Sequence, residues 1–136
     1  MELLAARARG TLGSGASRTV EVGRLERSLR DLTTACSPRW TSPEAAASPG
    51  GPTEDDDVVP VEVLVRRMLA GDLVRDLLRH TARCALTADE HRRIGLLRRQ
   101  ERHLADPMLT CAASELEALG WERYRRVGIV GCVEVG

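Results

Sequence analysis

Residues 86–105 read LTADEHRRIGLLRRQERHLA, and they carry the clearest secondary-structure signal in the chain. Thr87 is followed three residues later by Glu90. This is the spacing of a capping box, in which two side chains satisfy backbone N–H groups at the start of a helix. The apolar face of such a helix consists of Ile94, Leu97 and Leu104. We therefore predict a helix over residues 88–105 that turns this face inward.

Helical spacing also occurs upstream of that segment. Pro60 is tolerated in a first helical turn, and Gly71-Asp72 separates two apolar stripes that lie on different faces. The first stripe consists of Val61, Leu64, Val65, Met68 and Leu69, and the second of Leu73, Leu77 and Leu78. We predict a helix from Pro60 with a kink or a new helix at Asp72. A strand over residues 58–63 is the alternative, because this segment is rich in β-branched residues.

Downstream, we predict that Asp106-Pro107 ends the central helix and begins another. Gly120 ends this second helix as a cap in the left-handed conformation. The stripe of this helix consists of Leu109, Ala112, Ala113, Leu116 and Leu119. Residues 124–135 are then predicted to form a strand, with Val127, Ile129, Val133 and Val135 on one side. This strand could pair with one of the other Val-Glu-Val segments, residues 20–22 and 61–63. If it stays unpaired, it is an exposed edge that another chain could join.

The N-terminal part of the chain divides by composition into three segments. Residues 1–21 are rich in Arg and Ser and poor in acid, so we predict a flexible N-terminus, with a mitochondrial transit segment as the alternative. Residues 22–36 show heptad-like spacing and predict an amphipathic helix that packs on the domain or docks on a partner. Residues 37–57 are rich in Ser-Pro, Gly and acidic residues and predict a disordered linker. Its candidate phosphorylation sites are Ser37, Ser42, Ser48 and Thr53.

These patterns together predict a mainly α fold class. Residues 58–136 form a small helical domain of three to four helices with a short C-terminal β-strand, and the N-terminal third is disordered. The composition is that of an ordinary globular chain, with 43% apolar and 29% charged residues among 136. Its longest apolar run is four residues, which predicts no membrane span. Four scattered cysteines without a CxxC pair favour reduced thiols and an intracellular location, cytoplasmic or nuclear.

Chemistry-bearing motifs are sparse. No serine lies in a Gly-flanked elbow, no helix carries an inward pair of carboxylates, and no glycine-rich loop follows a strand. We therefore predict no catalytic residue, cofactor or small-molecule substrate. His80 and Cys84 have the four-residue spacing of two helical metal ligands, but no second ligand pair follows, so we predict no metal site. All 20 basic residues are arginine, and 20 acidic residues balance them. One arginine face stands out, made of Arg92, Arg93, Arg98, Arg99 and Arg102.

We therefore predict a non-enzymatic protein-interaction or adaptor module, a subunit or regulator within a larger complex. Its partner is another protein or a second copy of the chain. The predicted partner-binding residues are the apolar seam positions Val22, Leu25, Leu29, Leu32, Leu73 and Leu77. The alternative is a nucleic-acid-associated factor that contacts phosphates through the arginine face.

Overall fold

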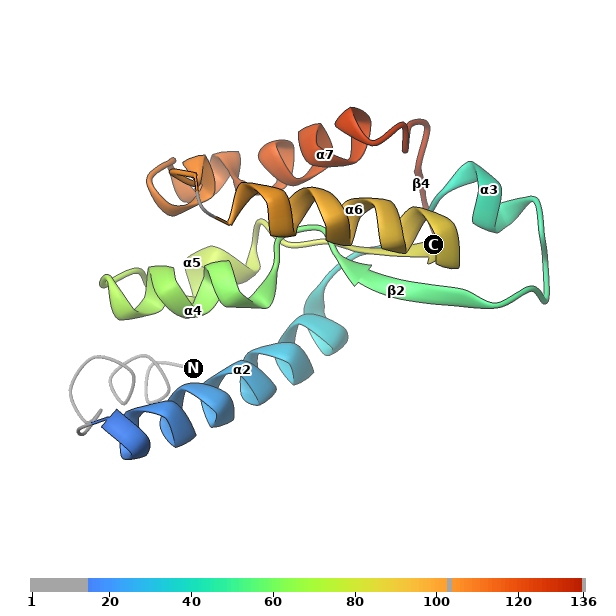
Figure 1. Ribbon diagram of the computed structural model, residues 1–136. Coiled ribbons are helices and arrows are strands. Elements are labelled where there is room, and N and C mark those ends of the chain that lie inside the picture. Colours follow the sequence, from blue (N-terminus) through green and yellow to red (C-terminus); the bar gives the residue numbers. More distant parts are fainter. Residues whose placement is uncertain (1–14, 103, 136) are drawn as a thin grey trace.

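A computed structural model of the chain describes residues 15–102 and 104–135. Helices and strands are interspersed along the chain (Figure 1). The α-helices are α2 (Gly15–Cys36), α3 (Pro43–Ala46), α4 (Val61–Leu69), α5 (Val74–Leu78), α6 (Ala88–Glu101) and α7 (Leu116–Arg126). The strands are β1 (Arg39–Thr41), β2 (Thr53–Asp57), β3 (Arg83–Thr87) and β4 (Val133–Glu134). Two 3-10 turns, η1 (Pro107–Leu109) and η2 (Ala113–Glu115), precede α7.

The four strands form one mixed sheet in the order β2-β3-β1-β4. β1 runs parallel to β3, whereas β2 and β4 are antiparallel edge strands. The register places Trp40 and Asp56 on either side of Cys84, which is fully buried at the centre of the sheet. Because side chains alternate along strands, these residues all face the same side of the sheet.

The buried apolar residues form two cores, the first between helices and the second against the sheet. In the first, α2 packs against α4, with Leu29 and Leu64 fully buried. The second lies between the sheet and the pair of helices α6 and α7, and it contains Ile94 and Tyr124. Figure 1 shows α6 and α7 on one side of the strands and α2 on the other. The sheet is therefore covered by α6 and α7 on the face that carries Cys84.

The predicted fold class is wrong. The fold is a mixed α/β arrangement with a four-stranded sheet, rather than three to four helices with one C-terminal strand. The predicted disorder of the N-terminal third is also wrong for residues 15–57, which contain α2, β1, α3 and β2. The acidic segment forms β2 because long-range contacts override its poor strand propensity. It pairs along its whole length with β3, and the carboxylate of Asp56 binds Arg98.

The C-terminal predictions also need correction. α6 ends at Glu101, and Leu104, which was expected to face inward, is 68% exposed. Gly120 lies inside α7 instead of capping a helix. An ideal Cβ on Gly120 would lie 2.5 Å from the carbonyl oxygen of Val58, so this glycine permits close helix packing. Because α7 continues to Arg126, the strand predicted over residues 124–135 shrinks to β4.

Local predictions were more successful. The capping box of Thr87 and Glu90 is present in full. The break at Gly71-Asp72 separates α4 from α5, and residues 61–69 are helical, so the strand alternative for residues 58–63 is wrong. The predicted helix over residues 22–36 extends back to Gly15. Residues 1–14 of the predicted flexible N-terminus lie outside the described residues.

Candidate functional site

The structure places the predicted partner-binding seam inside the chain's own core. Leu25, Leu29 and Leu77 are no more than 5% exposed, because α2 and α5 pack with α4. Val22 and Leu32 are half-buried against the same core, and Leu73 is half-buried just before α5. Burial of Leu25, Leu29 and Leu77 stabilises the fold, and binding of a partner through the half-buried positions of the seam stays a prediction.

The arginine face is partly neutralised by the chain itself. Arg92 and Arg93 both pair with Asp89 one turn earlier on α6. Arg98 turns inward, so it is not on the outer surface with the others. Only Arg99 and Arg102 of the five are exposed and have no ion pair among the residues that the structure describes. The surface charge available for phosphate contacts is thus smaller than the sequence indicates.

Arg98 belongs to a buried polar network. Its two terminal nitrogens lie 2.7 and 2.9 Å from the two carboxylate oxygens of Asp56, which is 5% exposed. The Tyr124 hydroxyl donates a hydrogen bond to the same carboxylate. Burial, and next the negative charge of Asp56, raise the pKa of Tyr124 above its ordinary value. This network joins β2 to α6 and α7 in a bidentate, charge-assisted arrangement.

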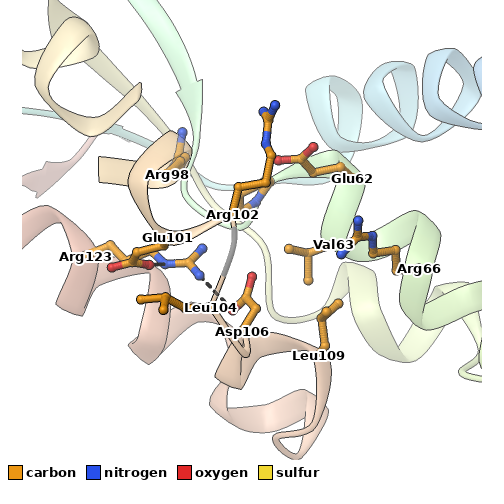
Figure 2. A pocket seen from close by; sticks show the side chains of 11 residues that line it. Glu62, Val63, Arg66, Arg98, Glu101, Arg102, Leu104, Asp106, Leu109 and Arg123 are labelled. Atoms are coloured by element: carbon orange, nitrogen blue, oxygen red, sulfur yellow. Dashed lines mark hydrogen bonds and ion pairs between the residues drawn. The ribbon is translucent and has the colours of Figure 1, made fainter. Parts of the chain in front are cut away.

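A small cleft lies next to this network (Figure 2). Its volume is about 80 Å³, and four arginines and three acidic residues line it, including Arg123, Glu101 and Asp106. Arg123 lies 3.1 Å from Glu101 and 2.7 Å from Asp106, as the dashed contacts in Figure 2 indicate. Three of the charged side chains in this small cleft are therefore paired with one another. Among its described lining residues there is no serine, cysteine or histidine that could act as a nucleophile.

An acidic hollow of about 270 Å³ adjoins the same C-terminal end of β2 and shares Pro60, Glu62 and Arg98 with the small cleft. Asp55, Asp56 and Asp57 line it together with His91, whose Nδ1 lies 2.6 Å from the Glu54 carboxylate. Burial raises the pKa of Asp57. Within residues 15–102 and 104–135, however, no group of three or more His, Cys, Asp or Glu side chains has the geometry to hold a metal ion.

A mainly apolar surface lies beside β1 and the segment that leads into β4. A groove of about 270 Å³ runs between Trp40, Trp121 and residues 129–132, and Arg125 lies at its rim. The two indole rings are in edge-to-face contact, with centroids 5.1 Å apart. Three valines stand out from the segment that ends the chain: Val130, Val133 and Val135 are 57%, 56% and 52% exposed. Of these, Val130 lines the groove, and Val133 and Val135 lie two residues apart on and next to β4. Contiguous exposed apolar surface is typical of interaction sites.

One side of β4 is open. The Val135 N–H donates to the Arg39 carbonyl at 2.8 Å, and Glu134 lies opposite Trp40. Because hydrogen-bonded and non-bonded positions alternate in an antiparallel ladder, the N–H and C=O of Glu134 point away from β1. They form the free edge of the sheet. The sequence identified these residues as strand-forming, but it could not show that the strand pairs on one side only.

Two of the predicted phosphorylation sites are inaccessible in the folded chain. Ser37 and Ser42 are buried, and their hydroxyls hydrogen-bond to Thr81 at 2.7 Å and to Glu90 at 2.6 Å. Ser48 and Thr53 are exposed, so modification of these two stays a prediction.

Comparison with protein-family models, curated proteins and solved structures finds no match for this chain. In the described part of the chain, no helix combines the length and the apolar character needed to cross a membrane.

Proposed function

We propose that the protein is a non-enzymatic protein-interaction module and that its binding surface is the C-terminal edge. The term C-terminal edge here means the open side of β4 together with Val130, Val133 and Val135. We further propose that the occupant is a second copy of the chain, which adds its own β4 to this edge. The observation that supports the proposal is an edge strand of two residues with free backbone groups and exposed valines beside it.

The two edges of the sheet differ in a way that favours β4. β2 reads TEDDD, and its residues Thr53, Glu54 and Asp55 are exposed. Like charges placed on an edge repel an approaching strand, which is how proteins protect such edges from association. β4 has no such run of charge, and its flanking residues are apolar. An incoming strand would therefore join the sheet at β4 and not at β2.

The charges around β4 favour an identical partner. Glu134 is the acidic residue of the edge, and the exposed Arg39 precedes its partner Trp40 on β1. The exposed Arg125 lines the groove and pairs with Glu122 at 3.0 Å. In a two-fold dimer each patch meets the same patch of the other copy, so a surface with an apolar centre and both signs of charge can be complementary to itself. Backbone hydrogen bonds from the free edge would supply the directional part of the interaction.

Sedimentation velocity over a wide range of protein concentration tests this proposal. We expect the full chain to dimerise reversibly as concentration rises. Val133→Lys should shift the equilibrium to monomer, because a lysine on an edge strand opposes pairing. Val20→Lys is the matched control, since Val20 is also 53% exposed but lies on α2. It should dimerise like the unsubstituted chain.

Circular dichroism of each variant shows whether the fold is intact. A chain that stays monomeric at every concentration would overturn the second copy as occupant. Equal loss of dimer in Val20→Lys and Val133→Lys would place the interface elsewhere and overturn the proposal for the C-terminal edge.

A further inference from the structure

The structure points to a second kind of site, which does not depend on the proposed function. We propose that Cys84 and Cys132 form a dithiol that a peroxide oxidises reversibly to an intramolecular disulfide. The two sulfur atoms lie 3.8 Å apart, although the residues are 48 positions apart in the sequence. They belong to different parts of the fold, Cys84 to the central strand β3 and Cys132 to the segment just before β4.

The two thiols differ in access. Cys84 is completely buried, whereas Cys132 is half-buried and lines the groove beside Trp40 and Trp121. A small oxidant that enters the groove reaches Cys132 first. Cys84 lies behind it, within contact distance, and is shielded from direct attack. This arrangement assigns different chemical roles to the two sulfurs.

Electrostatics support the same assignment. The Cys84 thiol donates a hydrogen bond to the Cys132 sulfur, which lowers the pKa of Cys132 despite its partial burial. The same contact, together with burial, raises the pKa of Cys84. Because the thiolate is the nucleophile in thiol chemistry, Cys132 is the sulfur that reacts first. Cys84 stays protonated and follows because its sulfur lies 3.8 Å from that of Cys132.

The reaction can be written in two balanced steps. The Cys132 thiolate attacks one oxygen of hydrogen peroxide and breaks the O–O bond, which gives a sulfenic acid, and the departing hydroxide takes up a proton to form water. Cys84 then attacks the Cys132 sulfur, the S–S bond forms, and the sulfenic oxygen leaves with the Cys84 proton as a second water. The peroxide accepts the two electrons that the two thiols lose. A dithiol reductant reverses the oxidation by thiol–disulfide exchange.

Disulfide formation requires the sulfurs to approach to about 2.05 Å. Cys132 can make this movement because it lies in a segment without helix or strand. Its neighbour Gly131 has φ +75°, and Gly128 at the start of the segment has φ +82°, conformations that glycine adopts readily. Cys84 stays fixed in the sheet. The product would therefore link the C-terminal segment covalently to β3.

The other two cysteines provide internal controls in the unsubstituted chain. Cys36 is exposed on α2, and Cys111 accepts a hydrogen bond from Arg67 at 3.4 Å. The chain is treated with an amount of hydrogen peroxide equal to that of the protein, alkylated, digested without reductant and analysed by mass spectrometry. We expect one dominant linked pair of peptides, which contains Cys84 and Cys132, and a dithiol reductant should separate it.

A second arm uses Cys84→Ser, in which Cys132 should accumulate as a sulfenic acid that reacts with dimedone. Dimedone labelling of Cys36 under the same conditions gives the rate of an ordinary exposed thiol. Oxidation of Cys36 at the same rate as Cys132, or the absence of the linked peptides from the unsubstituted chain, would overturn the proposal. Sedimentation of the reduced chain reports separately on dimerisation, so failure of one proposal does not affect the other.

Discussion

Asp56 belongs to a run of acidic residues, but its buried contact with Arg98 should make it contribute far more to the free energy of unfolding than its neighbours do. Asp56→Asn keeps the side-chain shape but removes the negative charge and one of two oxygen acceptors. Arg98 would remain 17% exposed beside a neutral group, and the Tyr124 hydroxyl would compete for the remaining oxygen. Breaking a buried pair in this way costs about 3–5 kcal/mol. Since the amide keeps one acceptor, we expect a loss of about 3 kcal/mol.

The neighbouring Asp55 is the matched control. Its side chain is 50% exposed and lies 3.6 Å from Arg83, so Asp55→Asn should cost at most about 1 kcal/mol. Urea unfolding followed by circular dichroism and tryptophan fluorescence measures both free energies of unfolding. Equal effects of the two substitutions would refute the reasoning, because they would show that Asp56 is no more important than an exposed carboxylate.

A double substitution separates the interaction energy of the Asp56–Arg98 pair from the cost of burying each charge. Arg98→Met alone should be destabilising, because it leaves the Asp56 charge buried without its partner. Arg98→Met combined with Asp56→Asn should be more stable than the sum of the single effects predicts, since no unpaired charge remains. A strictly additive result would contradict a direct interaction between the two side chains.

Three further predictions follow from other contacts. Tyr124 is the chain's single tyrosine, and its pKa in the fold is raised above the ordinary 10.0, so its contribution to stability is intact below pH 10 and is lost as pH rises further. Tyrosinate absorbance should therefore appear together with alkaline unfolding, and a titration near pH 10 in the intact fold would contradict its burial. Gly120→Ala should cost about 1–3 kcal/mol in urea unfolding because the new methyl group meets the backbone of Val58, whereas Gly95→Ala, with open space around it, should stabilise α6 by up to about 1 kcal/mol. A stabilising Gly120→Ala would refute the close packing. Elution from heparin tests the nucleic-acid alternative: the partly paired arginine face predicts release at low salt, and a steep salt dependence of binding to DNA or RNA would favour that alternative instead.

The sequence was most informative where structure depends on neighbouring residues. The capping box of Thr87 and Glu90 is a local signal, and it located the start of α6 correctly. The break at Gly71-Asp72 was found for the same reason. The end of α6 was predicted four residues too late, because the stripe that includes Leu104 continues in the sequence after the helix has ended.

The sheet could not be predicted because its strands depend on distant partners. β2 is an acidic segment that is strand-like only in the presence of β3 and Arg98. β1 has three residues and lies between two strands from distant parts of the chain. Without the sheet, the sequence had no reason to bring Cys84 close to Cys132. Nor could it show that the leucines of α2 would be buried while the C-terminal valines remain exposed.

The central claim is that a second copy of the chain pairs with the open side of β4. Amide hydrogen exchange, followed by NMR at low and high protein concentration, tests this claim at the backbone N–H of Glu134. The Val135 N–H already donates to Arg39 and should be slow to exchange at both concentrations. The Glu134 N–H points to the free edge, so we predict rapid exchange when the protein is dilute and clear slowing when it is concentrated. Rapid exchange of the Glu134 amide at both concentrations would contradict the account.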